Sequence, residues 1–193
     1  MTTTHLLYLH GFRSSPQSAK ARQVAERVRT QHPAMQLGCP QLPASPREAM
    51  ALVMAGIAAW PFASMAVIGS SLGGFYATWV AHQTGCKAVL LNPAVDPARD
   101  LARYIGELTS WHDPQQRFFF RPEYVDEARA LGLAPDAALA ARMFAIVAKG
   151  DEVLDWHEMT ARYAGARIKL LAGGDHALSD FEDHLDEVFS FIA

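Results

Sequence analysis

Residues 64–74, SMAVIGSSLGG, decide how this chain is expected to fold. A short apolar run over 65–68 leads into GSSLG at 69–73, which has the form G-x-S-x-G, and a helical pattern follows over 72–84. A strand, a sharp turn and a helix in this order are what a nucleophile elbow requires. Ser71 lies at the centre of the pattern and is the candidate nucleophile. The alternative is a turn rich in glycine and serine that has no chemistry.

Apolar runs alternate with helical patterns on both sides of this turn. The pattern predicts strands over 5–10, 35–39, 64–70, 87–92, 143–150 and 166–174, and helices over 17–31, 46–59, 72–85, 156–164 and 179–192. Such alternation predicts βαβ units. We therefore expect an α/β protein with a three-layer α/β/α fold and a mostly parallel sheet of about six strands. In the first helix, Pro16 is expected at or near the first turn, and Val24 and Val28 on the inner face.

Residues 95–141 interrupt the alternation and are too long for one connection. We read residues 1–193 as a single domain in which 95–141 form a small helical insertion of two or three short helices, a lid or cap. A helical crossover is the alternative. Its apolar residues are expected to line an acyl pocket or to form the insertion's own small core: Leu108, Trp111, Phe118, Phe119 and Phe120.

Composition excludes several classes of function. With 17 basic and 20 acidic residues the net charge is −3, too near neutral to indicate nucleic-acid binding or electrostatic membrane attachment. The two cysteines form neither a disulfide framework nor a zinc-ligand spacing, and no metal or cofactor is expected. No leader or membrane-spanning run is visible, so we expect a cytoplasmic protein.

A nucleophilic serine needs a base, and the base needs an acid that orients it. The acid and the base should follow later strands, in the order Ser, acid, His. His176 follows the last expected strand after a Gly-Gly turn and is the best candidate base. Asp151, the first carboxylate after the preceding strand, is the favoured acid. Asp155, which could instead cap the next helix, and Asp175 are the alternatives.

An oxyanion hole needs two backbone N–H groups directed at the developing charge. The amide of Leu72, directly after the nucleophile, is one candidate. The other is the amide of Phe12 in the loop after the first strand, where Gly11 lets the backbone turn back over the serine. Arg13 could attract an anionic group of the substrate or lie exposed on the surface. His10 is expected to stabilise this loop.

Five stretches together resemble an α/β-hydrolase, and more narrowly the small YqiA-type bacterial esterases. They are residues 10–16 (HGFRSSP), 69–74 (GSSLGG), 91–94 (LNPA), 150–155 (GDEVLD) and 173–176 (GGDH). The resemblance covers roughly residues 5–190. It implies an esterase or thioesterase without a cofactor, in which Ser71 is the nucleophile, Asp151 the acid and His176 the base.

The leading hypothesis is therefore a serine hydrolase that cleaves small-molecule acyl esters or thioesters through an acyl-enzyme intermediate. Gly11, Arg13 and Phe119 are the candidate substrate-binding residues. An amidase or peptidase would use the same three side chains. A non-catalytic ligand-binding module with this fold is the alternative outside enzymes. The sequence predicts no oligomeric state.

Overall fold

A sheet of six parallel strands forms the centre of the molecule, in the order β2-β1-β3-β4-β7-β8. Its strands are β1 (His5–Leu9), β2 (Gln36–Gly38), β3 (Met65–Ser70), β4 (Lys87–Leu91), β7 (Met143–Ala148) and β8 (Arg167–Leu171). The structure is a computed structural model, and it describes residues 2–110, 115 and 117–193. The six parallel strands confirm the predicted sheet. Each observed strand falls inside one of the six ranges that the apolar runs predicted.

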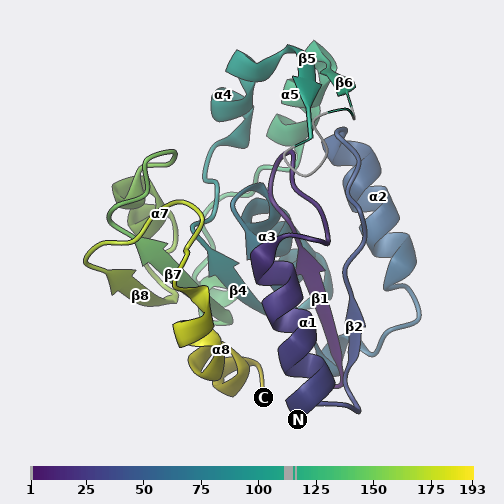
Figure 1. Ribbon diagram of the computed structural model, residues 1–193, viewed down its shortest axis with the longest axis vertical. Coiled ribbons are helices and arrows are strands. Elements are labelled where there is room, and N and C mark those ends of the chain that lie inside the picture. Colours follow the sequence, from purple (N-terminus) through teal and green to yellow (C-terminus); the bar gives the residue numbers. More distant parts are fainter. Residues whose placement is uncertain (1, 111–114, 116) are drawn as a thin grey trace.

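Helices cover both faces of this sheet, which gives the predicted three layers (Figure 1). On one face, α1 (Ala19–Gln31) and α8 (Leu185–Ile192) pack their apolar residues against β1, β3, β4 and β7. On the other face lie α2 (Pro46–Gly56), α3 (Leu72–Thr84) and α7 (Trp156–Arg162). Strands β3 and β7 are buried at every position because both of their faces are covered.

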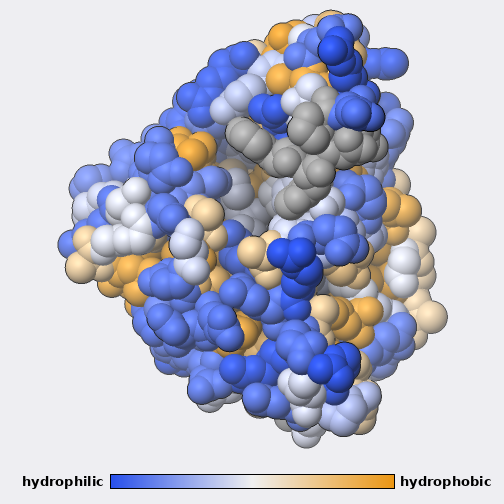
Figure 2. All heavy atoms as spheres, in the orientation of Figure 1, coloured by the Kyte–Doolittle hydropathy of each residue, from blue (hydrophilic) through white to orange (hydrophobic). Residues whose placement is uncertain are grey.

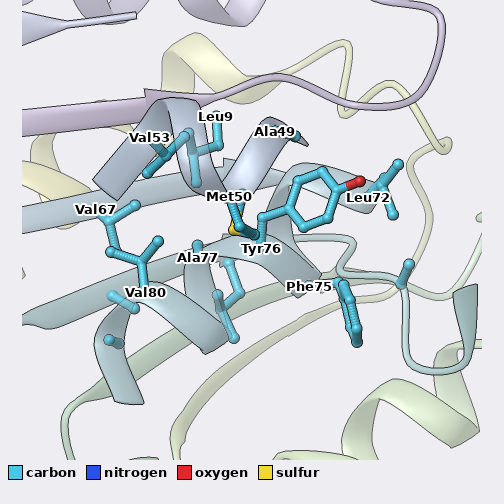
Figure 3. Packing of buried hydrophobic residues seen from close by; sticks show 14 of the residues in the cluster. Leu9, Ala49, Met50, Val53, Val67, Leu72, Phe75, Tyr76, Ala77 and Val80 are labelled. Atoms are coloured by element: carbon cyan, nitrogen blue, oxygen red, sulfur yellow. The ribbon is translucent and has the colours of Figure 1, made fainter. Parts of the chain in front are cut away.

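The core on the α2–α3 side is densely packed around Tyr76. Figure 3 shows its ring among Leu72, Met50 and Ala77, with Leu9 and Val67 contributed by neighbouring strands. Burial of large side chains from four elements fixes how α3 lies on the sheet, at about 25 cal/mol of stabilisation per Å² of apolar surface removed from water. The first residues of α3 are thereby held at the carboxyl end of β3.

The first helix begins later than its sequence suggests. Ser18, not the Ser-Pro pair at 15–16, is the N-cap of α1, and its side chain accepts a hydrogen bond from the Ala21 amide. Pro16 therefore lies in the preceding loop, two residues before the N-cap, which is near the first turn but not in it. Val24 and Val28 are buried on the inner face as expected.

Residues 95–141 contain more than short helices. They include α4 (Pro97–Leu101), the 3-10 helix η2 (Ala102–Tyr104), α5 (Pro122–Ala130) and α6 (Ala137–Ala140). Between them, β5 (Gly106–Thr109) and β6 (Arg117–Phe120) form an antiparallel pair. The predicted short helices are present, but the prediction did not include the strand pair, because a four-residue aromatic strand carries too little periodicity to be recognised. Elements α4, β5, β6 and α5 lie beyond the carboxyl ends of the strands (Figure 1), whereas α6 lies near the amino end of β8, where the Ala140 side chain adjoins Gly165.

The remaining short elements complete the chain: η1 (Phe62–Ser64) before β3, and η3 (Phe181–His184) before α8. The face that carries α1 and α8 is mostly hydrophilic, with scattered hydrophobic patches (Figure 2). Within the part of the chain that the structure describes, none of the helices has both the length and the apolar character to cross a bilayer.

Candidate active site

The turn between β3 and α3 holds Ser71 in a backbone conformation that side chains rarely adopt, with φ 56° and ψ −120°. The turn is possible only because its neighbours lack side chains. A Cβ atom at Gly69 would overlap the Gly73 carbonyl oxygen, and one at Gly73 would overlap the Leu9 carbonyl oxygen. The Ser71 amide donates to the Leu91 carbonyl at 2.9 Å, which ties the turn to β4. The serine is thus presented beyond the sheet, at the first turn of α3.

Two side chains from separate loops, His176 and Asp151, form a chain of contacts with this serine. The His176 Nε2 atom lies 3.0 Å from the Ser71 Oγ atom, and its Nδ1 atom lies 2.8 Å from Asp151 Oδ2. With Asp151 as a carboxylate, which only accepts, Nδ1 carries the proton and Nε2 is free to accept the serine proton. The residues expected to be nucleophile, base and acid are therefore brought together in the relative order that proton transfer requires.

Asp151 is held rigidly. Its side chain is fully buried, and its Oδ1 atom accepts from the amides of Val153 and Leu154, each at 2.8 Å. The other acids lie elsewhere: Asp155 caps α7 and contacts the His157 ring, while Asp175 binds Ser179. Hydrogen bonds from Ser179 hold the pKa of Asp175 below its ordinary value. Geometry thus selects Asp151 among the candidate acids.

Asn92 supports the histidine loop, and the sequence reading gave it no role. Its side chain is completely buried at the end of β4. The Nδ2 atom donates to the Asp175 carbonyl at 2.9 Å, and the Oδ1 atom accepts from the Ala148 amide at 2.8 Å. The side chain therefore links β4, β7 and the loop that carries His176. A polar residue directly after an apolar strand was the available signal.

The loop after β1 lies directly over the nucleophile. A Cβ atom at Gly11 would lie 3.2 Å from the Ser71 Cβ atom. His10 is buried, its Nε2 atom accepts from the Leu42 amide at 3.1 Å, and its Nδ1 atom lies 2.9 Å from the Gly11 carbonyl. Because Nε2 accepts, Nδ1 must be the protonated donor. His10 stabilises this loop, as the sequence indicated.

Two backbone amides are available near Ser71. Leu72 is the first residue of α3, where amides have no acceptor within the helix. Phe12 follows Gly11 over the serine, and its ring packs away against Phe120 and Tyr104, with ring centroids 5.2 and 5.5 Å apart. Packing of this ring fixes the backbone of Phe12.

Arg13 joins the first loop to the insertion. Its Nε atom donates to the Thr109 carbonyl at 2.7 Å, and its Nη2 atom to the Thr109 hydroxyl at 3.1 Å. Its backbone is left-handed, with φ 58°. The side chain therefore lines the Ser71 side of the site and contacts β5 at the same time. It is half-buried, so it is neither a fully exposed surface arginine nor an enclosed one.

Phe119 lies away from the site. Alternation along β6 turns Phe118 and Phe120 inward, toward Phe12, and leaves Phe119 55% exposed. The structure therefore does not support a substrate contact by Phe119. Phe118, on the opposite face of β6, is the residue that lines a cavity. Trp111, also considered for an acyl pocket, lies outside the described residues.

The serine lines one cavity, and a second cavity shares part of its wall, formed by Gly11, Phe12, Arg13, Ser14 and Leu72. The Ser71 cavity, of about 440 Å³, also contains Ser71, His176 and Leu101. The Phe118 cavity, of about 560 Å³, extends between Leu42, Leu52 and Phe118.

The fold is that of the α/β-hydrolases, as similar solved structures show. Est1E from Butyrivibrio proteoclasticus, with bound ferulic acid, is 14% identical, with a TM-score of 0.69 over 97% of this chain and 87% of that one. The mouse alpha/beta hydrolase domain-containing protein 10 is 14% identical, with a TM-score of 0.69 over 100% and 92%. An esterase from Pyrococcus furiosus is 16% identical, with a TM-score of 0.67 over 99% and 81%.

The family is narrower than this fold. A family model described as "Uncharacterised protein family (UPF0227)" matches residues 5–193, and the chain belongs to that family. The match agrees with the resemblance to YqiA-type proteins that the sequence motifs indicated.

Proposed function

We propose that the protein is a serine hydrolase that cleaves acyl ester or thioester bonds of small molecules. The observation that carries the proposal is the chain of contacts from Ser71 through His176 to the buried Asp151, at 3.0 and 2.8 Å. The hydrolase and esterase names of the similar structures agree with it. A cytoplasmic location is part of the proposal.

In the proposed reaction, Ser71 Oγ attacks the substrate carbonyl carbon while His176 Nε2 takes the hydroxyl proton. The amides of Phe12 and Leu72 donate to the oxyanion that forms. His176 then gives the proton to the leaving oxygen or sulfur, and the bond to the leaving group breaks. Water attacks the acyl-serine, His176 accepts a proton from it, and the acid leaves as Ser71 regains its hydrogen. Asp151 keeps the imidazole oriented and stabilises its charged form.

A matched pair of carboxamide variants tests this assignment with 4-nitrophenyl butyrate. Asp151→Asn should lower kcat by roughly 10³-fold or more, because the amide cannot hold the required tautomer of His176. Asp155→Asn should stay within about threefold of the wild type, since asparagine also caps helices. Equal losses in both variants would contradict the proposal.

A second assay distinguishes ester from amide cleavage by replacing 4-nitrophenyl butyrate with the corresponding amide, butyryl 4-nitroanilide. The proposal expects hydrolysis of the ester and not of the anilide. Cleavage of the anilide at a comparable rate would favour the amidase alternative, and no cleavage of either compound by folded protein would favour a binding module.

A further inference from the structure

The Ser71 cavity has a positively charged wall that the proposed hydrolysis does not use. Lys20 comes from the first turn of α1, Arg13 from the first loop and Arg103 from η2, and all three line this cavity. Of the described residues that line it, Asp100 and no other is acidic, and Asp100 Oδ1 is bound to Arg99 at 2.8 Å. Three cations and one carboxylate of the described residues thus line the cavity, and the charge of this lining favours an anion.

Lys20 is half-buried and contacts the loop that carries His176. Its Nζ atom donates to the carbonyl of Ala177, the residue after His176. Burial lowers the pKa of Lys20, and the more distant Asp175 and Asp151 partly raise it again. Among the described residues no carboxylate lies within ion-pair distance of Nζ. An ammonium has three donor hydrogens, so Lys20 can donate to a bound group as well as to Ala177.

The Tyr8 hydroxyl is a second, independent feature of the same wall. Tyr8 is 1% exposed, lines the Ser71 cavity, and its Oη atom has no hydrogen-bond partner among the described residues. Burial raises the pKa of this phenol, and the Ser18 hydroxyl, which approaches Oη without meeting hydrogen-bond geometry, offsets the rise only in part. The group is therefore protonated and able to donate. A buried polar atom without a partner is costly and requires an explanation, which a bound ligand supplies.

We propose that Lys20 and Tyr8, with Arg13 and Arg103 nearer the opening, bind an anionic group of the substrate, a carboxylate or a phosphate a few bonds from the scissile ester. The proposal rests on the proposed hydrolase function and narrows its substrate class to acidic esters. A half-buried cation without a contacting carboxylate is stabilised when an anion completes its environment. The phenol hydroxyl would add a charge-assisted hydrogen bond.

Two pairs of esters test the preference and locate the anion. Monomethyl glutarate and dimethyl glutarate differ by a charge on the acyl half, whereas 3-acetoxypropanoate and propyl acetate differ by a charge on the alcohol half. In at least one pair, the wild type should show the higher kcat/KM for the charged ester. Lys20→Met should lower the charged-to-neutral ratio of kcat/KM roughly tenfold or more, the typical value of a hydrogen bond to a charged group.

Matched variants separate binding of the anion from support of the histidine loop. Lys20→Arg should restore much of the ratio, and Tyr8→Phe should lower it in the same pair of esters. Arg22→Met removes a positive charge from the same helix outside this cavity and should leave the ratio at the wild-type value. A Lys20→Met variant that slows both members of a pair equally would mean that Lys20 only positions the loop, and would overturn the proposal.

A binding measurement remains decisive even if turnover is absent. Ser71→Ala protein should bind monomethyl glutarate or 3-acetoxypropanoate in calorimetry more tightly than the neutral partner, and the added Lys20→Met change should abolish the difference. Equal affinity for charged and neutral members in both pairs would overturn the anion site. Failure of the hydrolase function is recognised separately, by a folded wild type that does not react with a fluorophosphonate.

Discussion

The conformation of Ser71 depends on two glycines, Gly69 and Gly73. Its positive φ is held by the Gly69–Gly73 turn, where backbone atoms of β3, α3 and β1 approach too closely for any Cβ atom. Strain of this kind persists only where surrounding structure determines it. The glycines therefore have a steric role here that their positions in the G-x-S-x-G pattern predicted.

Gly69→Ala should lower the free energy of unfolding by about 3 kcal/mol or more, since the new methyl group meets backbone that cannot yield. Gly56→Ala is the matched control, because nothing lies within 4 Å of a Cβ atom there and the residue ends α2. Urea denaturation of both variants measures the difference. A Gly69→Ala protein as stable as Gly56→Ala would show that the turn is not as tight as described.

The sequence pattern predicted the three catalytic candidates, but it predicted the residues that surround them less well. Ser71, Asp151 and His176 each follow an apolar strand, and parallel strands bring their carboxyl ends to one edge. Lys20 gives no such signal, because its closeness to Ala177 arises from the packing of α1 beside a distant loop. Phe119 was misplaced because the direction of its side chain depends on the register of β6, which its sequence alone leaves open.

At the scale of elements, Arg13 connects the loop over Ser71 to the hairpin of β5 and β6. The two hydrogen bonds to Thr109 join segments that are 96 residues apart in the chain. We propose that the insertion, 95–141, caps the site, and that Arg13 sets the position of its hairpin. Short strands with one face exposed have little stability of their own.

Arg13→Ala should therefore increase the rate of amide hydrogen exchange in Gly106–Thr109, while β3 and β4 keep their protection. Thr109→Val is the graded comparison, because it removes the hydroxyl contact and retains the carbonyl contact with Arg13. Exchange measured by mass spectrometry should rise in the order wild type, Thr109→Val, Arg13→Ala. Unchanged exchange in Arg13→Ala would show that Arg13 does not set the position of the hairpin.

The elements themselves were predictable where their patterns are long. The buried strands are continuous apolar runs, and α2 begins where Ser45 precedes Pro46. The hairpin was missed because β5 and β6 have four residues each and partly exposed faces, so neither a continuous run nor a clear alternation marks them. Three-dimensional contact with Phe12, rather than local pattern, stabilises them.

Across the whole molecule, the last helix and the last strand are joined by charge as well as by apolar packing. Glu187 in α8 accepts from Arg167 at 2.5 Å and from Lys169 at 2.6 Å, both in the edge strand β8. Hydrogen bonds from Lys169, the larger cause, and from Arg167 hold the pKa of Glu187 below its ordinary value of 4.5. Charged side chains on an edge strand also oppose pairing with another chain.

Because the pKa of Glu187 is lowered in the folded protein, this residue should make the free energy of unfolding rise with pH in the acidic range. The contribution of Glu187 is fully present above pH 4.5 and is lost as the pH falls through the lower pKa of the folded state. Glu187→Gln should thus cost up to about 1 kcal/mol of unfolding free energy at pH 7, as for other partly exposed ion pairs, and less below pH 4.5. Glu182→Gln, a change without an ion pair among the described residues, is the control. A constant difference across this range would contradict the assignment.

The central claim, that Ser71 is an activated nucleophile, is tested most directly by intact-mass analysis after incubation with a fluorophosphonate at neutral pH. Wild-type protein should gain the mass of a single adduct, and Ser71→Ala should gain none. This result requires no knowledge of the natural substrate, because the probe needs only a reactive serine, its base and donors for the oxyanion. An unlabelled, folded wild type, or an adduct that persists in Ser71→Ala, would contradict the claim.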